Sequence, residues 1–171
     1  MFNLTDQVNA DEVRRALRRA QPFCFLSKSS NQTLTTGVDT AITWNVDQSD
    51  AWGMHDTGSN TERIVAPIYG RYFFTVNVTW PAAGSGTSTK RLRLLSNALI
   101  QTDPFSSGAA IFAEFDMVGV PDSGLERQHL CGVGVINAGD YVYAEALQAT
   151  GGDLDIEAGN FSTSMVAIFL G

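Results

Sequence analysis

From residue 22 to the C-terminus, apolar positions alternate with polar ones, and the alternating stretches are rich in β-branched and aromatic residues. Gly, Pro, Asp, Asn and Ser interrupt them at fairly regular intervals. Such alternation is typical of strands with one buried face, because successive side chains point to opposite faces of a sheet. The pattern predicts ten strands, over residues 23–29, 40–46, 51–54, 63–66, 71–80, 87–95, 110–118, 128–136, 141–148 and 163–170.

The stretch over residues 71–80 shows the alternation most clearly. One face carries only large apolar side chains: Tyr72, Phe74, Val76, Val78 and Trp80. The other face mixes an aromatic ring with polar groups: Phe73, Thr75, Asn77 and Thr79. We therefore expect the first face to line the core and the second to be partly polar. Several short strands at this spacing favour an all-β fold of two packed sheets, a sandwich or jelly roll.

Residues 1–21 differ from the rest of the chain. Asn9 is a candidate N-cap, acidic residues follow it, and Pro22 ends the segment. The apolar positions fall on one helical stripe: Val13, Leu17 and Ala20. A helix of this length with so narrow a stripe is marginal in water and needs a surface to lie on. We interpret it as an arm that docks on another protein; the alternative is a helix packed on its own domain.

The net charge of −7 is distributed unevenly along the chain. Residues 1–21 carry four arginines and three acidic residues, whereas the other 150 residues carry 7 basic and 15 acidic ones. An acidic body repels phosphate backbones, so we expect no nucleic-acid partner. No apolar run is long enough to span a bilayer, so we expect no membrane insertion. Asp6, Asp11 and Glu12 lie where a secretory signal peptide needs basic and apolar residues, so we expect none.

Three sequence blocks follow one another in a distinctive order. Pro67 precedes Gly70-Arg-Tyr72-Phe-Phe74 at the start of the long strand, the turn Ala-Gly139-Asp140 follows a late strand, and residues 165–171 end the chain as MVAIFLG. In this order and spacing they resemble the jelly-roll heads of complement component one, subunit q, and of tumour necrosis factor. The resemblance covers about residues 23–171.

The resemblance implies a ten-strand, two-sheet jelly roll (residues 22–171) that forms a tight homotrimer through an aromatic and aliphatic face. It also implies that Cys24 and Cys131 lie on strands of one sheet with others between them, too far apart for a disulfide. The complement-like proteins usually have a collagen stalk and a signal peptide, whereas this chain has a basic helical arm. The combination looks more like the collagen-free jelly rolls that decorate bacteriophage particles.

The sequence therefore suggests a non-enzymatic virion protein of a tailed bacteriophage, made in the host cytoplasm and displayed on the virion surface. It would be a capsid decoration protein, a head fibre or a minor tail protein. Its head would decorate the particle or attach to a host glycan or protein. The arm residues expected to bind the capsid or tail protein are Val13, Arg14, Arg15, Leu17, Arg18 and Arg19. The alternative is a soluble cytokine-like or complement-like receptor ligand.

Catalytic chemistry finds little support in the sequence. His55 and His129 are the only histidines, and no nucleophile elbow, HExxH motif or phosphate-binding loop is present. We predict no catalytic residues and no enzymatic activity. Next to Leu130 and Cys131, His129 is interpreted as an interior or interface histidine.

Three alternating acids, Asp153, Asp155 and Glu157, are candidate calcium ligands, because an extended segment places them on one side. The alternative is a solvated loop, with no cofactor and no other metal. Asp47, Asp50 and Asp56 form a weaker candidate group.

Aromatic residues outside the core could stack on sugars in a receptor-binding head. The candidates are Trp44, Trp52, Trp80, Tyr69, Tyr72, Tyr141 and Tyr143, and most of them are expected in the core. Lys90, Arg91 and Arg93 share one strand and are expected at the surface, facing solvent or an acidic neighbouring subunit.

Overall fold

The computed structural model describes residues 21–81, 89–97, 110–118 and 124–171, and every regular element within these ranges is a β-strand. Residues 1–20 of the arm (residues 1–21), which include all its predicted docking residues, lie outside the described ranges. The strands are β1 (Phe23–Lys28), β2 (Gln32–Leu34), β3 (Thr40–Ala41), β4 (Val46–Asp50), β5 (Arg63–Val65), β6 (Gly70–Trp80), β7 (Thr89–Ser96), β8 (Ala110–Val118), β9 (Glu126–Ile136), β10 (Tyr141–Ala149), β11 (Leu154–Ile156) and β12 (Gly159–Phe169).

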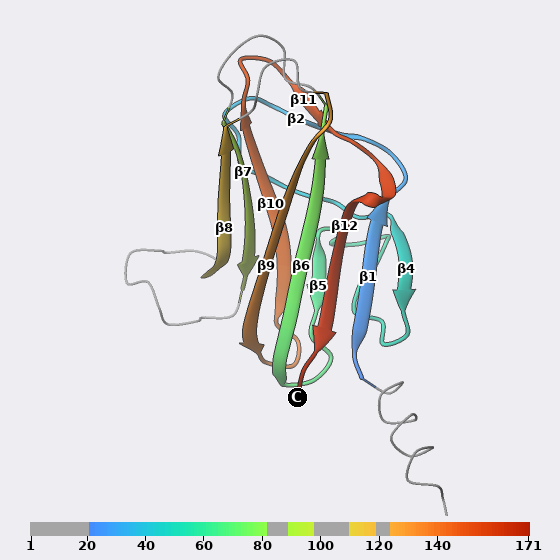
Figure 1. Cartoon of the computed structure of the whole chain (residues 1–171). Helices are drawn as coiled ribbons and strands as arrows, with labels where there is room; N and C mark the ends of the chain where they lie inside the picture. Colours follow the sequence, from blue (N-terminus) through green and yellow to red (C-terminus); the bar gives the residue numbers. More distant parts are fainter. Residues whose placement is uncertain (1–20, 82–88, 98–109, 119–123) are drawn as a thin grey trace, which may run out of the picture.

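Two antiparallel sheets form the body of the molecule. The first has the order β4-β1-β12-β6-β9, and the second has the order β3-β10-β7-β8, with β5 also paired to β10. A small third sheet pairs β2 with β11. Figure 1 shows the long strands running along the molecule, with the C-terminus and the start of β1 at one end and β2 and β11 at the other. Strand neighbours far apart in sequence, such as β1 beside β12, give the jelly-roll connectivity.

The core lies between the two sheets. Tyr72, Val76 and Trp80 of β6 are fully buried there, as the alternation predicts, while Phe73 and Thr75 on the other face are only half-buried. Trp44 and Met165 complete the packing from other elements. An all-β sandwich follows from this arrangement, because each sheet hides one face against the other.

At two positions of the three sequence blocks, Gly70 and Gly139, the structure explains why the residue is glycine. A Cβ on Gly70 would lie 2.2 Å from Cε2 of Phe169, so only glycine lets the final strand pack against the start of β6. Gly139 has a φ of +88° and donates its N–H to the carbonyl of Ala66, 2.9 Å away. The turn after β9 therefore ties the β5 region to the β9–β10 hairpin.

The strand boundaries differ from the sequence prediction in a few places. The expected strand 40–46 is divided between β3 and β4, and the expected strand 51–54 is a turn in which Gly53 has a φ of +63°. Strands β2, β4 and β11 were not predicted as such. They are short or polar, since β4 reads VDQSD, and edge strands of this kind need no apolar alternation.

Candidate functional site

The outer face of the first sheet carries rows of side chains that cross four strands. In one row Phe23, Ile168, Phe73 and Val133 lie in register on β1, β12, β6 and β9. Phe23 is 37% exposed and Val133 is 54% exposed, and their shared row with Ile168 and Phe73 makes them part of a contiguous apolar patch rather than scattered exposed residues. We call this surface the apolar face, with members Phe23, Phe25, Phe73, Val133, Val135, Val166 and Ile168.

The apolar face becomes polar toward the other end of the sheet. Two rows further along the same face, Ser27, Ser164, Asn77 and His129 lie in register. His129 is exposed on this face and its Nε2 lies 2.8 Å from Thr75 Oγ1. The interior interpretation of His129 is therefore wrong for the single chain, because odd-numbered residues of β9 point away from the core.

The outer face of the second sheet has a different chemistry. Arg93 of β7 pairs with Glu114 of β8, and its Nη1 lies 3.5 Å from Glu145 Oε1 of β10. Arg91 pairs with Asp39. The basic residues of β7 are thus neutralised by acids of the same chain, and an acidic neighbouring subunit is not needed to explain them.

Lys90 departs from the expected surface position. It is fully buried between the sheets, because it shares the core-facing side of β7 with Leu92 and Leu94. Its Nζ pairs with the Glu126 carboxylate of β9 and lies 5.6 Å from the centroid of the Trp80 ring. A buried charge needs such a partner, and this pair links β7 to β9 across the interior.

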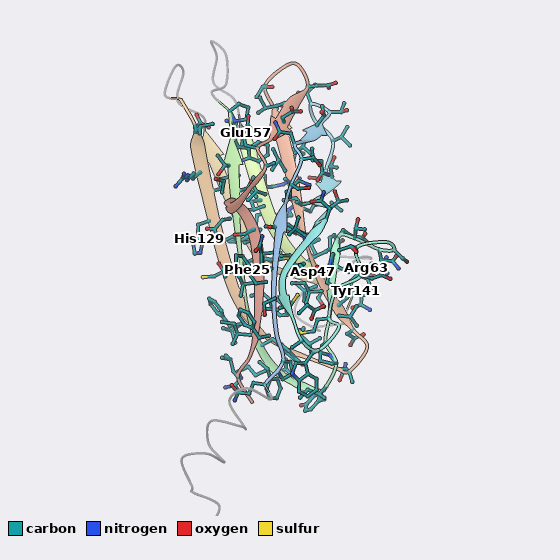
Figure 2. The ribbon with its side chains drawn as sticks, turned by 90° about the vertical axis from the view of Figure 1, so that its right-hand side faces the viewer. Phe25, Asp47, Arg63, His129, Tyr141 and Glu157 are labelled. Carbon is teal, nitrogen blue, oxygen red and sulfur yellow. The ribbon has the colours of Figure 1, made fainter. Side chains whose placement is uncertain are left out.

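Beside the ion pairs, β5 and β10 form an aromatic hollow of about 250 Å³, lined by Ala41, Glu62, Arg63, Tyr141 and Tyr143. The Arg63 guanidinium lies 4.1 Å from the centroid of the Tyr141 ring, and its Nε is 2.7 Å from Glu62 Oε1. The two tyrosine rings are 6.2 Å apart. Figure 2 shows Arg63 and Tyr141 next to each other on one side of the molecule, with His129 on the opposite side.

The β4–β5 connection holds the buried histidine of the chain. His55 Nδ1 lies 2.7 Å from Asp47 Oδ1, and Nε2 lies 3.0 Å from the Thr61 carbonyl oxygen. A carboxylate beside a histidine is half of a hydrolytic triad, but the second nitrogen must face a nucleophile. Here it faces a backbone carbonyl, so the pair holds the loop rather than activating a hydroxyl or thiol.

The other acids of this connection also hold backbone. Asp50 accepts hydrogen bonds from the N–H groups of Met54 and His55, and Asp56 accepts one from the N–H of Gly58. Asp50 and Asp56 therefore serve as turn acceptors, and with the Asp47–His55 contact this accounts for all three acids of the candidate group.

The calcium candidates lie around β11. Asp155 accepts a hydrogen bond from Thr33 Oγ1 at 2.6 Å, and Asn31 Nδ2 lies 3.3 Å from Glu157 Oε2. Asp153 is exposed. Among the described residues, no three His, Cys, Asp or Glu side chains are grouped as a metal site requires. The calcium hypothesis thus gains no support from the geometry.

The two cysteines are free. Cys24 on β1 and Cys131 on β9 are separated in the first sheet by β12 and β6, a distance of about 14 Å at the usual strand spacing, so the predicted lack of a disulfide is confirmed. Burial raises the pKa of the Cys24 thiol, and Asp50 and Asp47 raise it further, so this thiol is unreactive. Cys131 is exposed beside the apolar face.

No family model matches the chain, and no curated protein sequence matches it significantly. Solved structures do match it. Murine APRIL at pH 5.0 has a TM-score of 0.64 at 10% identity, covering 88% of this chain and 99% of that one. Eiger TNF from S. frugiperda has a TM-score of 0.59 at 12% identity, covering 88% and 93%. The fold is a TNF-like jelly roll. The similarity to a second murine APRIL structure, at pH 8.0, agrees, with a TM-score of 0.63 at 9% identity.

Within the TNF-like jelly roll, the predicted aromatic residues divide into three groups. Trp44, Trp80 and Tyr72 are core, as expected for most of the set. Trp52 and Tyr69 are exposed, at 38% and 67%. Tyr141 and Tyr143 are half-buried at the hollow and are brought together with Glu62 and Arg63, two residues that no sequence motif marks as binding residues.

The described part of the chain contains no helix that is long and apolar enough to cross a membrane.

Proposed function

We propose that the protein is a non-enzymatic homotrimer that works by binding, as a virion component of a tailed bacteriophage. The head, residues 22–171, would assemble through the apolar face, and residues 1–21 would attach it to a capsid or tail protein. The observation that carries the assembly step is the row Phe23, Ile168, Phe73 and Val133, four apolar side chains in register across four strands of an outer face.

A trimer suits this surface better than a free monomer. Large apolar side chains grouped on one outer face mark an interaction surface, because isolated soluble chains rarely leave them contiguous. The polar row through Asn77 and His129 gives the same face a hydrogen-bonding end, as at interfaces that mix an apolar centre with a polar rim. A closed ring of identical copies buries the face without leaving an open edge.

The virion assignment rests on the contrast between arm and head. The arm carries Arg14, Arg15, Arg18 and Arg19, while the head is acidic. Opposite charges steer association, so the arm suits an acidic docking surface on a different protein. Decoration of the particle is the first role of such a head, and adsorption to the host surface is the second.

A soluble cytokine-like ligand is the second candidate, because the structural neighbours include APRIL and Eiger TNF. A ligand of that kind would not need the arm to reach its site of action. The two candidates therefore differ in what removal of residues 1–21 does.

The test is to measure the protein on purified particles after complementation with the full chain or with the chain lacking residues 1–21. We expect the truncated head to fold and to be absent from particles. Normal amounts of truncated protein on particles would contradict anchoring and favour the soluble ligand.

Two arm variants separate charge from apolar contact. Changing the four arginines to Ala should weaken attachment and flatten its dependence on salt, since steering is screened. Changing Val13 and Leu17 to Asp should abolish attachment at any salt concentration. Attachment that survives both changes would contradict the arm as the anchor.

A further inference from the structure

We infer that the hollow between β5 and β10 is a binding site for an uncharged oligosaccharide. This inference deepens the host-adsorption role of the proposed function, because it names a ligand class and the residues that would hold it. The site lies on the outer face of the second sheet, on the other side of the sandwich from the apolar face, so trimer formation would leave it open.

The hollow has the groups that recognise a sugar. A sugar ring has an apolar face of C–H groups and a rim of hydroxyls, so its partner must combine an aromatic surface with donors and acceptors. Tyr141 and Tyr143 supply two rings that are tilted by 44° and 6.2 Å apart. Glu62 adds acceptor oxygens and Arg63 adds N–H donors from the neighbouring strand end.

These groups are held in place before any ligand arrives. The β5–β10 register sets Tyr143 opposite Arg63 and Tyr141 opposite Val65. Arg63 is held from two sides, by the Tyr141 ring and by the Glu62 carboxylate. Fixed aromatic and planar charged groups lose little conformational entropy when a ligand binds, which favours affinity.

Polar capacity remains for a ligand. Within the described part of the chain, neither tyrosine hydroxyl has a hydrogen-bond partner, and the Arg63 side chain contacts Glu62 and the Tyr141 ring and interacts electrostatically with Tyr143. Burial raises the pKa of Tyr143, with Glu145 and Tyr141 adding to it, so its hydroxyl is a proton donor over the whole physiological range.

The size and charge of the site select the class of ligand. The hollow of about 250 Å³ is below the volume of drug-sized pockets, roughly 300–1,000 Å³, and suits one sugar ring. The only charged residues among the described ones that line it, Glu62 and Arg63, pair with each other, so the lining offers no unpaired cation to attract sialic, uronic or sulfated sugars. A protein partner would need a broad apolar centre, whereas the ion pairs of Arg91 and Arg93 occupy the neighbouring surface.

A second hollow of about 160 Å³ shares the lining residue Arg63 with the first, and we expect it to accept a second sugar. Arg63 lines both hollows, and the second is also lined by Asp56, Ser59 and Asn60. Its carboxylate, hydroxyl and amide groups suit sugar hydroxyls rather than another aromatic contact. A chain of two or more sugars would therefore bind more tightly than one.

The experiment is a glycan array probed with the labelled full-length protein, with neutral, sialylated, uronate-containing and sulfated members. We expect binding to neutral oligosaccharides only. Titration calorimetry with the strongest neutral member should then show affinity reduced roughly tenfold or more in Tyr143→Ala and Tyr141→Ala, because each removes a stacking surface.

Matched variants keep the result interpretable. Tyr69→Ala removes the same type of ring at a more exposed position outside the site and should leave affinity unchanged. Tyr143→Phe keeps the packing and removes one hydroxyl, so a smaller loss should appear even if the Ala variant fails to fold. Asn60→Gly suits the φ of +51° at this position and should weaken binding of oligosaccharides but not of the single sugar.

Three outcomes would overturn the inference. They are no binding to any neutral member, binding to acidic members only, and neutral binding that the tyrosine variants leave intact. The glycan array tests sugar binding by the head, and the particle assay tests attachment through the arm. Either proposal can therefore be contradicted without affecting the other.

Discussion

The two outer faces of the sandwich are built on the same pleated geometry but carry opposite chemistry. The first sheet presents Phe23, Phe73 and Val133 with no charge between them in register. The second sheet presents Arg93 between Glu114 and Glu145, and these three charges pair with one another within the chain. A face whose charged groups are paired within the chain is stable in contact with solvent, whereas a contiguous apolar face is stabilised when a partner covers it. This difference is the basis for proposing self-association through the first sheet and ligand binding on the second sheet.

The largest expected effect comes from charging the apolar face. Val133→Asp with Val135→Asp should convert the trimer to folded monomers, because each carboxylate would be buried without a partner at the interface. Light scattering with circular dichroism measures both properties. Val65→Asp is the matched control, since Val65 is also a partly exposed strand valine but lies on the second sheet. If both variants stay trimeric, the assignment of the faces is wrong.

Substitutions in the buried ion pair between the two sheets should have the next largest effect, on the free energy of unfolding. Glu126→Leu leaves Lys90 buried without its carboxylate and should lower the free energy of unfolding by about 3 kcal/mol. Adding Lys90→Met should recover most of that loss, because an apolar pair of similar volume carries no buried charge. Urea unfolding at one fixed protein concentration measures both variants. A double variant no more stable than the single one would show that the charge pair is not the cause.

The ion pairs of the second face should contribute little. Arg93→Ala should lower the free energy of unfolding by about 1 kcal/mol or less, because its partners Asp39 and Glu114 are 41% and 37% exposed and the pairs are screened by water and salt. The same measurement at high salt should show a smaller difference. A loss as large as that of Glu126→Leu would mean that this face is as structural as the interior.

The smallest expected effect is a pH dependence at Glu145. Burial raises the pKa of this carboxyl, Asp39 adds to the rise, and Arg93 opposes it. A carboxyl whose folded pKa is raised contributes stability that is present below its unfolded pKa and is lost as the pH rises through its folded pKa. Glu145→Gln should therefore remove a small fall in stability across the mildly acidic range. Parallel pH profiles for the two proteins would contradict the raised pKa.

The sequence predicted the fold because the pattern and the geometry coincide in the long strands. Tyr72, Val76 and Trp80 alternate in β6 and are buried, and Gly70 is required by the approach of Phe169. The sequence pattern does not predict strand β4, because an edge strand can be polar on both faces. Its position is set by its pairing with β1, and this pairing cannot be read from the local pattern of apolar and polar residues.

The sites were less predictable than the fold. Tyr141 and Tyr143 could be selected by residue type, but Arg63 and Glu62 join them only through the β5–β10 pairing, far along the chain. A surface position is predicted for Lys90 because lysine side chains are usually exposed. However, Lys90 alternates with Leu92 and Leu94, and this spacing indicates the core-facing side of the strand. Its acidic partner on β9 could not be chosen from the sequence alone.

The central claim is that the apolar face is an interface between three identical chains. Sedimentation equilibrium of the full-length protein at micromolar concentration tests it most directly. The account predicts a single species of three times the 18.4 kDa chain mass, with Cys131 slow to react with a thiol reagent until the trimer is dissociated by Val133→Asp with Val135→Asp. A monomer at that concentration, with Cys131 reacting at the rate of a free exposed thiol, would contradict it.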